Sequence, residues 1–220
     1  MAGRWTAGRT GGENQLTVIR LLRTGIERLV ASPGAYAWSQ SLSDPFRLVP
    51  LRRVVAGIPH SSLLDLGCGS GDLCAMTASA YTGVDGSPAN IAYARRHHGA
   101  PGRRFEVGDL LALDGSLGAH ELVVMASVLH HLADDEVRRC LAGLAVVRPG
   151  RLLVVDIALE RTGPVFRRTI TPLDRGRHFR TTSAIRELLT AAGWRTERET
   201  GWTSYNRLFP YVGLLATPPP

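Results

Sequence analysis

The spacing of apolar residues changes along this chain of 220 residues. Between residues 13 and 31 they recur every three or four positions, the period of an amphipathic helix. These residues are Leu16, Ile19, Leu22, Ile26, Leu29 and Val30. Two shorter helices are expected over 36–42 and 45–56, so residues 13–58 are predicted to form a helical cap. Residues 1–12, rich in glycine, arginine and threonine, are predicted to be disordered.

After the cap, short apolar runs alternate with helical stretches. The strands are expected over 62–66, 82–84, 104–107, 122–125 and 152–157. The intervening helices are expected over 72–80, 88–97 and 134–147. Such alternation predicts βαβ units and a mostly parallel sheet with right-handed crossovers. A helix over 182–192 and strands over 194–200 and 205–217 then predict an antiparallel hairpin at the sheet edge, within one domain over 59–217.

Composition places the chain among globular proteins, with 44% hydrophobic and 20% charged residues. Cys68, Cys74 and Cys140 are scattered, so neither a disulfide framework nor a metal site is expected. No apolar run approaches the roughly 18 residues of a membrane span. Because no apolar stretch follows Met1, we expect a cytoplasmic protein.

The charge is unusual because all 26 basic residues are arginine and lysine is absent, which gives a net charge of +7. The absence of lysine excludes a P-loop, whose Gly-Lys-Ser/Thr sequence binds phosphates. A basic protein can bind nucleic acid, but a lysine-free composition is also typical of a GC-rich genome. The net charge alone therefore does not identify a partner.

The segment from Leu63 to Leu73 reads Leu-Leu-Asp-Leu-Gly-Cys-Gly-Ser-Gly-Asp-Leu and is the most informative part of the chain. A buried strand leads into glycines at alternate positions, where the backbone can take positive φ angles and a ligand can approach closely. A dinucleotide loop would read Gly-x-Gly-x-x-Gly. Here the third of those glycines is replaced by Asp72, whose carboxylate would repel a diphosphate.

Further polar residues follow the next predicted strands. Asp85 ends one strand and Asp109 follows another, and a His-His pair, His130 and His131, comes after a third. In open α/β sheets, ligands bind at the carboxyl ends of the strands, beside the switch in strand order. A carboxylate at the position of Asp85 can accept ribose hydroxyls, and one at the position of Asp109 can accept from an adenine amine.

With these motifs, the stretch from Leu63 to Leu159 resembles class I S-adenosylmethionine-dependent methyltransferases, including the small-molecule branch of ubiquinone and menaquinone methyltransferases. The resemblance implies a Rossmann-like α/β fold with a seven-stranded, mostly parallel sheet of order 3-2-1-4-5-7-6, strand seven antiparallel and helices on both faces. It implies S-adenosyl-L-methionine as cofactor, converted to S-adenosyl-L-homocysteine. The cofactor-binding residues it implies are Asp65, Gly67, Cys68, Gly69, Gly71, Asp85, Gly86, Ser87, Asp109, Leu110, Ala126 and Ser127.

The reaction implied is in-line transfer of a methyl group to a nucleophile, for which alignment provides much of the rate. An oxygen acceptor needs its proton removed, and His130 and His131 are the candidate general bases. The alternative is that both histidines cap the following helix and pack against the cofactor. Cys68 is expected to be a small packed residue rather than a nucleophile.

The acceptor pocket is expected between the cap, the segment after the fifth strand and the final hairpin. Its candidate residues are Tyr36, Trp38, Arg177, His178 and Tyr205, with Trp202, Phe209 and Tyr211 nearby. Each aromatic residue could equally belong to the core. Six arginines between residues 161 and 180 could bind a carboxylate or phosphate of the acceptor, or form a solvated loop.

The sequence therefore predicts a methyltransferase that acts on a small organic acceptor, at the oxygen of a phenol, hydroxyl or carboxylate first and at carbon next, in biosynthetic or secondary metabolism. One alternative is an RNA or DNA methyltransferase, which is disfavoured because Met125-Ala-Ser-Val128 replaces the Pro-Pro turn of base-amine methyltransferases. Another is a non-catalytic partner subunit with the same fold. The oligomeric state stays open, a homodimer included.

Overall fold

A computed structural model describes residues 48–164, 166–171, 176–204 and 209–219. Its sheet has seven strands in the order β3-β2-β1-β4-β5-β7-β6, as predicted. The strands are β1 (Ser62–Leu66), β2 (Ala80–Asp85), β3 (Arg103–Val107), β4 (Leu122–Ala126), β5 (Arg151–Ile157), β6 (Arg195–Thr203) and β7 (Pro210–Thr217). The main helices are α3 (Leu48–Ala56), α4 (Pro88–His98), α5 (Asp134–Gly143) and α6 (Thr182–Ala191).

The strands β1 to β5 pair in parallel, whereas β7 runs antiparallel to both β5 and β6. The chain moves outward from β1 through β2 to β3, and then crosses back to place β4 on the other side of β1. The switch in strand order therefore lies between β1 and β4. Loops that leave the carboxyl ends of these two strands diverge there and create room for a ligand.

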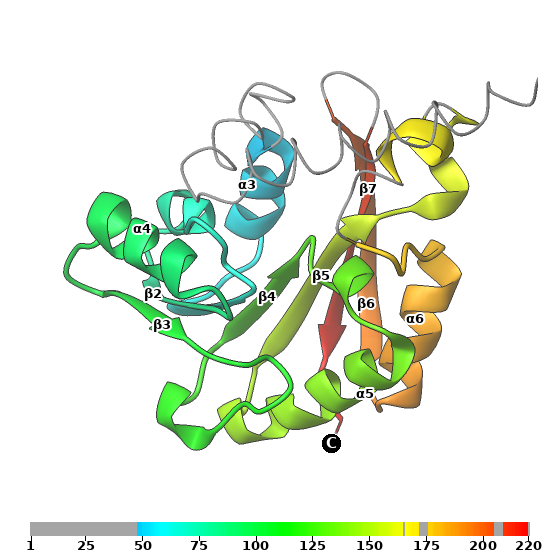
Figure 1. Ribbon diagram of the computed structural model, residues 1–220. Helices are drawn as coiled ribbons and strands as arrows, with labels where there is room; N and C mark the ends of the chain where they lie inside the picture. The colour runs from blue at the N-terminus through cyan, green and yellow to red at the C-terminus, as the bar shows by residue number, and fades with distance from the viewer. Residues whose placement is uncertain (1–47, 165, 172–175, 205–208, 220) are drawn as a thin grey trace, which may run out of the picture.

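Helices cover both faces of the sheet (Figure 1). Alternate strand residues such as Leu64 and Val123 pack with α5 and α6, while their neighbours Leu63 and Val124 pack with α3 and α4. Because both faces are buried, the central strands are apolar throughout rather than alternating. Buried charged side chains in these strands are therefore exceptional, and the two present, Asp65 and Asp156, both lie near carboxyl ends.

Two expectations about helices need correction. The helix predicted over 72–80 is only the five-residue 3-10 helix η1 (Asp72–Met76), after which Thr77 is extended. The Thr77 hydroxyl accepts the N–H of Ser79, a local bond that competes with helix continuation. The stretch 134–147 is α5 followed by the 3-10 helix η4 (Leu144–Val147).

Of the predicted cap, the structure describes only the last helix, α3, and residues 1–47 lie outside the described ranges. Among the described residues, no helix is long and apolar enough to cross a membrane. The arginine pairs at 52–53, 95–96 and 138–139 are exposed on their helices. Much of the positive charge therefore lies on outer helix faces.

The N-cap of α6 offers a test of this architecture. The Thr181 hydroxyl accepts the N–H of Ala184 at 3.2 Å. Thr181→Ala is expected to lower the free energy of unfolding by about 1 kcal/mol, the usual contribution of a hydroxyl N-cap. Thr181→Ser, which keeps the hydroxyl, should restore most of it. Urea denaturation followed by circular dichroism measures both, and equal stabilities for the two variants would contradict the assignment of the cap.

Candidate active site

The loop that follows β1 turns at three glycines. Gly67, Gly69 and Gly71 have φ angles of 76°, 53° and 84°, which residues with a Cβ atom rarely adopt. The N–H of Gly67 donates to the carbonyl oxygen of Val84 at 2.8 Å, which fixes the loop against the end of β2. A Cβ atom on Gly67 would lie 2.5 Å from Cγ2 of Val128, whereas one on Gly69 would meet no atom within 4 Å. The backbone at Gly69 therefore borders open space.

Asp65 is a buried carboxylate in β1, just before this loop. The Tyr81 hydroxyl donates to its Oδ2 atom at 2.6 Å. Burial raises the pKa of Asp65 to about 7; the Tyr81 hydrogen bond opposes this rise, and the negative charges of Asp85 and Asp72 add to it. Carboxylates grouped around one loop favour a cationic ligand over an anionic one.

Asp85 ends β2, and its carboxylate holds the glycine loop. Its Oδ2 accepts the N–H of Gly69 at 2.9 Å, and its Oδ1 accepts from the N–H of Ser87 at 2.9 Å and the side-chain amide of Asn90 at 3.1 Å. Ser87 in turn caps α4, because its hydroxyl accepts the N–H of Asn90. These bonds fill three of the roughly four acceptor positions of a carboxylate. One ribose hydroxyl can be added, and a second would replace a present donor.

An open cavity of about 540 Å³ lies beside the ends of β2 and β3. Its lining residues are Gly86, Val107, Gly108, Asp109, Leu110, Leu111 and Leu132. Asp109 is exposed, and its Oδ1 accepts the N–H of Leu111 at 2.8 Å, which orders the turn after β3. A mostly apolar lining with one carboxylate suits a flat heterocycle that carries a donor group.

The chain leaves the sheet after Ala126, the last residue of β4, and bends at Ser127. Ser127 has a φ angle of 58°, a left-handed conformation that costs energy outside glycine. Its N–H donates to the carbonyl oxygen of Val155 at 2.8 Å, so β5 holds this bend in place. The bend leads directly into the 3-10 turn η3 (Leu129–His131), which carries both predicted histidines.

His130 is buried in this turn and bonded to Asp156, a buried residue near the end of β5. The Nδ1 atom of His130 lies 2.7 Å from Oδ1 of Asp156, and the N–H of His130 donates to Oδ2 at 3.0 Å. Asp156 also accepts the N–H of Ile157 at 2.7 Å. An ionised carboxylate only accepts hydrogen bonds, so a neutral His130 ring carries its proton on Nδ1 and its lone pair on Nε2.

The other candidates near this turn are exposed. His131 is exposed, with its ring centroid 4.1 Å from that of His130. Arg177 and His178 are exposed too, and the N–H of His178 donates to the carbonyl oxygen of His130 at 3.0 Å. The structure therefore brings the backbone of His178 against the His130 turn. The predicted acceptor residues Tyr36, Trp38 and Tyr205 lie outside the described residues.

A continuous row of aromatic rings leads from His130 to the β6–β7 hairpin. The His130 ring stacks on Phe179 with centroids 5.0 Å apart and planes 6° apart. Successive centroids along the rest of the row are 5.7 to 6.4 Å apart. Its further members, in order, are Phe166, Phe209, Tyr211 and Trp202. Trp202 and Tyr211 also pack against the core on the side of α3 and α4.

Three of the six arginines between 161 and 180 are already bonded to other groups of the protein. Arg161 pairs with Glu199, Arg167 donates to the carbonyl oxygen of Leu159, and Arg180 is buried against Asp134. These guanidinium groups are bound to the protein itself. Of the remaining three, Arg168 and Arg177 are exposed and Arg175 lies outside the described residues.

Sequence reasoning missed Asp156 and Tyr81, which hold His130 and Asp65. A signal for Asp156 was present, because a charged residue in the apolar run 152–159 is unusual and buried charges require partners. Cys68 is a packed thiol, as expected, and burial raises its pKa. Among the residues that the structure describes, no three side chains of the metal-binding kinds cluster to hold an ion.

Comparison with known proteins agrees with this arrangement. Residues 63–150 match the family model for a methyltransferase domain. Residues 63–150 are therefore similar to methyltransferase domains, and the strand order and the glycine loop after β1 are those expected of the class I S-adenosylmethionine-dependent methyltransferases.

The chain is 34% identical over 113 residues to trans-aconitate 2-methyltransferase of Deinococcus radiodurans. The aligned stretch covers 49% of this chain and 42% of that protein. The chain is 36% identical over 107 residues to ubiquinone biosynthesis O-methyltransferase of Methylocella silvestris, covering 46% and 40%. The aligned part thus spans about two fifths of the length of these relatives. Human N-acetylserotonin methyltransferase, solved with S-adenosylmethionine, has a similar fold, with a TM-score of 0.66 at 22% identity over 89% of this chain and 59% of that chain.

The high pKa of Asp65 predicts how stability changes with pH. Folded Asp65 titrates near 7 and unfolded aspartate near 3.8, so the folded protein binds the additional proton and stability falls as pH rises between these values. Asp65→Asn keeps an acceptor for Tyr81 and should remove this fall, which is on the order of 4 kcal/mol. Urea denaturation at several pH values, without ligand, measures this change in the free energy of unfolding.

The control for this experiment is Asp109→Asn, which removes one exposed carboxylate near the same strand ends. This variant should follow the pH dependence of the unaltered protein. If the Asp65→Asn curve has the same slope as the unaltered protein between pH 4 and 7, Asp65 does not titrate as described.

Proposed function

We propose that this protein transfers a methyl group from S-adenosylmethionine to an oxygen atom of a small organic acceptor. The observation that carries the proposal is the convergence, at the carboxyl ends of neighbouring strands, of the glycine loop, Asp85, Asp109 and the His130–Asp156 pair. The first three suit the cofactor, and the fourth suits removal of a proton from an acceptor.

S-adenosylmethionine fits the charges and the open space around the loop. When bound, it supplies an electrophilic methyl group on a positively charged sulfur. Asp85 would accept a ribose hydroxyl, the cavity with Asp109 and Leu110 would take the adenine, and the backbone at Gly69 would contact the methionine part. The carboxylates of Asp65 and Asp85 favour the cationic cofactor over its neutral thioether product, which assists exchange after transfer.

The remaining loop residues are assigned by the same argument. Gly67 and Gly71 shape the loop, and Ala126 and Ser127 end β4 beside it. Cys68, Gly86 and Ser87 complete the proposed cofactor site through their backbone, since Cys68 is packed and Ser87 already caps α4.

Binding of the cofactor product tests the first half of the proposal. S-adenosylhomocysteine should bind with one equivalent at micromolar affinity in isothermal titration calorimetry. Asp85→Ala should weaken binding by about 10- to 100-fold, because hydrogen bonds to a charged group contribute about 1.5–3 kcal/mol. The control is Asp114→Ala, which removes an exposed turn carboxylate that accepts the backbone N–H of Ser116. Failure of the unaltered protein to bind would refute the proposal.

His130 is the group proposed to receive the proton of the acceptor. Asp156 holds the ring in the tautomer whose Nε2 accepts protons, and it stabilises the imidazolium that results. His131 is the lesser candidate because it is exposed, whereas His130 is buried against Asp156. The base serves an acceptor hydroxyl, which is a poor nucleophile until its proton leaves.

A planar acceptor is favoured by the aromatic row beside His130, because rings stack well on flat conjugated molecules. Two relatives are named for O-methylation in ubiquinone biosynthesis and for methylation of trans-aconitate, which supports small acceptors in biosynthetic metabolism. A phenol is thus the first choice, and a carboxylate the second. The exposed Arg177 and His178 and the predicted Tyr36, Trp38 and Tyr205 remain candidates for contacts with it.

His130→Gln separates these two acceptor classes. With phenols, kcat should fall by about 100-fold or more, and its decline at low pH should disappear, because a general base contributes about 10²- to 10⁴-fold. With carboxylates, which are already ionised at pH 7, His130→Gln should change kcat little. Transfer of labelled methyl groups to a panel of both classes measures this.

The control is His97→Gln, at an exposed histidine of α4 that stacks on Tyr93. It should leave rates and pH dependence unchanged. A phenol methylated equally well by the unaltered protein and by His130→Gln would exclude His130 as the base.

A further inference from the structure

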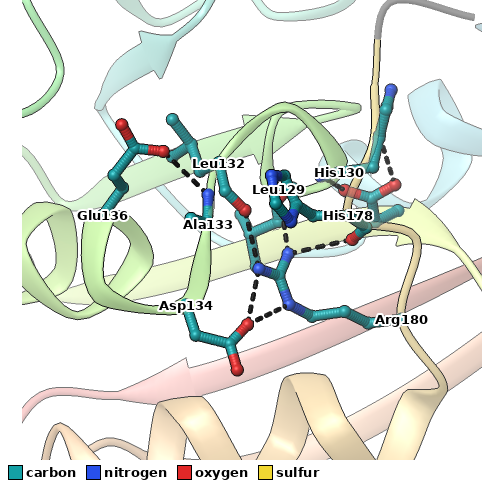
Figure 2. A network of polar contacts seen from close by, with 9 residues as sticks. Leu129, His130, Leu132, Ala133, Asp134, Glu136, His178 and Arg180 are labelled. Atoms are coloured by element: carbon teal, nitrogen blue, oxygen red, sulfur yellow. Dashed lines mark hydrogen bonds and ion pairs between the residues drawn. The ribbon is translucent and has the colours of Figure 1, made fainter.

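Arg180 has a buried guanidinium group whose five N–H groups all find acceptors. Its side chain is 8% exposed. Nε and Nη2 donate to Oδ1 of Asp134 at 2.9 and 2.7 Å, and Nη2 also donates to the carbonyl oxygen of Leu132 at 2.6 Å. Nη1 donates to the carbonyl oxygens of Leu129 at 2.6 Å and His178 at 3.1 Å. Figure 2 shows the guanidinium between these groups.

The carbonyl acceptors bracket His130 on both sides. Leu129 precedes it and Leu132 lies two residues after it, so Arg180 holds both ends of the η3 turn. The third carbonyl belongs to His178, whose own N–H donates to the carbonyl oxygen of His130. The backbone of His130 is thus held at its N–H by Asp156 and at its carbonyl by a residue that Arg180 also binds.

An ion pair alone does not explain this burial. Asp134 is 60% exposed, and an ion pair with so exposed a partner contributes little, whereas burying a guanidinium group is costly. The cost is offset only because three main-chain carbonyls complete the hydrogen bonding. All three lie in or against the turn of His130, which indicates that the geometry of this turn is what Arg180 determines.

Arg180 also connects the end of β5 to the η3 turn through its backbone. The N–H of Leu159, just after β5, donates to the carbonyl oxygen of Arg180 at 3.0 Å. The residue before Arg180 is Phe179, which stacks on the His130 ring. The segment from His178 to Arg180 is therefore bonded to the end of β5 through Leu159 and to the His130 turn through the Arg180 side chain.

We propose that Arg180 is a positioning residue for methyl transfer, which holds the η3 turn so that His130 keeps Nδ1 on Asp156 and Nε2 as the proton-accepting nitrogen. Arg180 acts through His130, so this inference rests on the proposed function. A lysine cannot replace it, because an ammonium group has three donors on one atom and cannot reach acceptors spread around a planar fork.

Arg180→Lys tests the proposal, with Arg95→Lys as its control. Arg95 also uses its guanidinium to bind a main-chain carbonyl, that of Phe105, but on the α4 side of the sheet. Arg180→Lys should lower kcat for a phenol by about 10-fold or more while the affinity for S-adenosylhomocysteine stays within about twofold. Arg95→Lys should leave kcat unchanged.

A double-mutant cycle separates positioning from general destabilisation. In a His130→Gln background, Arg180→Lys should reduce kcat by less than about twofold, because a residue that acts through His130 has nothing left to position. An equal loss of kcat in both backgrounds would overturn the proposal.

A readout without turnover keeps the test independent of the proposed function. In ¹⁵N NMR at pH 8, the His130 ring of the unaltered protein should show a protonated Nδ1, and Arg180→Lys should show a mixture of tautomers. An unchanged tautomer in the variant overturns the positioning role. If the unaltered protein transfers no methyl group, the proposed function fails, while the NMR comparison still decides what Arg180 does.

If Arg180→Lys does not fold, Asp134→Asn serves in its place. The asparagine still accepts at Oδ1 but loses the charge that orients Nε and Nη2, so the guanidinium should be held less firmly. The same tautomer shift and the same non-additivity with His130→Gln are expected, in smaller measure. Their absence in a folded Asp134→Asn protein counts against the proposal.

Discussion

The arrangement of the candidate active site depends on how the buried carboxylate of Asp156 is satisfied. A carboxylate inside a protein is stable only when donors surround it, and here the donors are the N–H of Ile157 and two groups of His130. These bonds attach the turn after β4 to the end of β5, the neighbouring strand in the sheet. The carbonyl oxygen of His130 then accepts the N–H of His178, and this bond holds the segment before α6 against the turn.

Two groups of polar side chains lie along the carboxyl edge of the sheet. Asp65 and Asp85 lie at the ends of β1 and β2, around the glycine loop, whereas His130 and Arg180 lie beyond the ends of β4 and β5. This separation suits a transfer in which a cationic donor meets an acceptor that must lose a proton. Each group also meets a different need of the fold, because Asp85 accepts the backbone N–H of Gly69 in the loop and Arg180 donates to backbone carbonyls.

Local sequence patterns predicted the strands well, because a strand buried on both faces is a short apolar run between turns. The strand order came from the family resemblance and is confirmed. The helix expected over 72–80 was wrong, since Thr77 and Ser79 bond locally and end the turn. Contacts between distant residues could not be read from periodicity. Asp156 meets a histidine 26 positions earlier, and Arg180 meets an aspartate 46 positions earlier. Counting charges along the chain therefore grouped Arg180 with exposed arginines, although its side chain is buried and paired.

All basic residues of this protein are arginines, and several of them bind backbone carbonyls within the chain. Arg95, Arg103, Arg167 and Arg180 each donate to a main-chain carbonyl. A guanidinium can serve several such acceptors at once, which an ammonium group cannot. Part of the net charge of +7 is therefore explained by backbone hydrogen bonding inside one chain, and a basic composition need not indicate a nucleic-acid partner. Where the bound carbonyls flank a candidate base, as at Arg180, the same structural use of arginine determines the geometry available for chemistry.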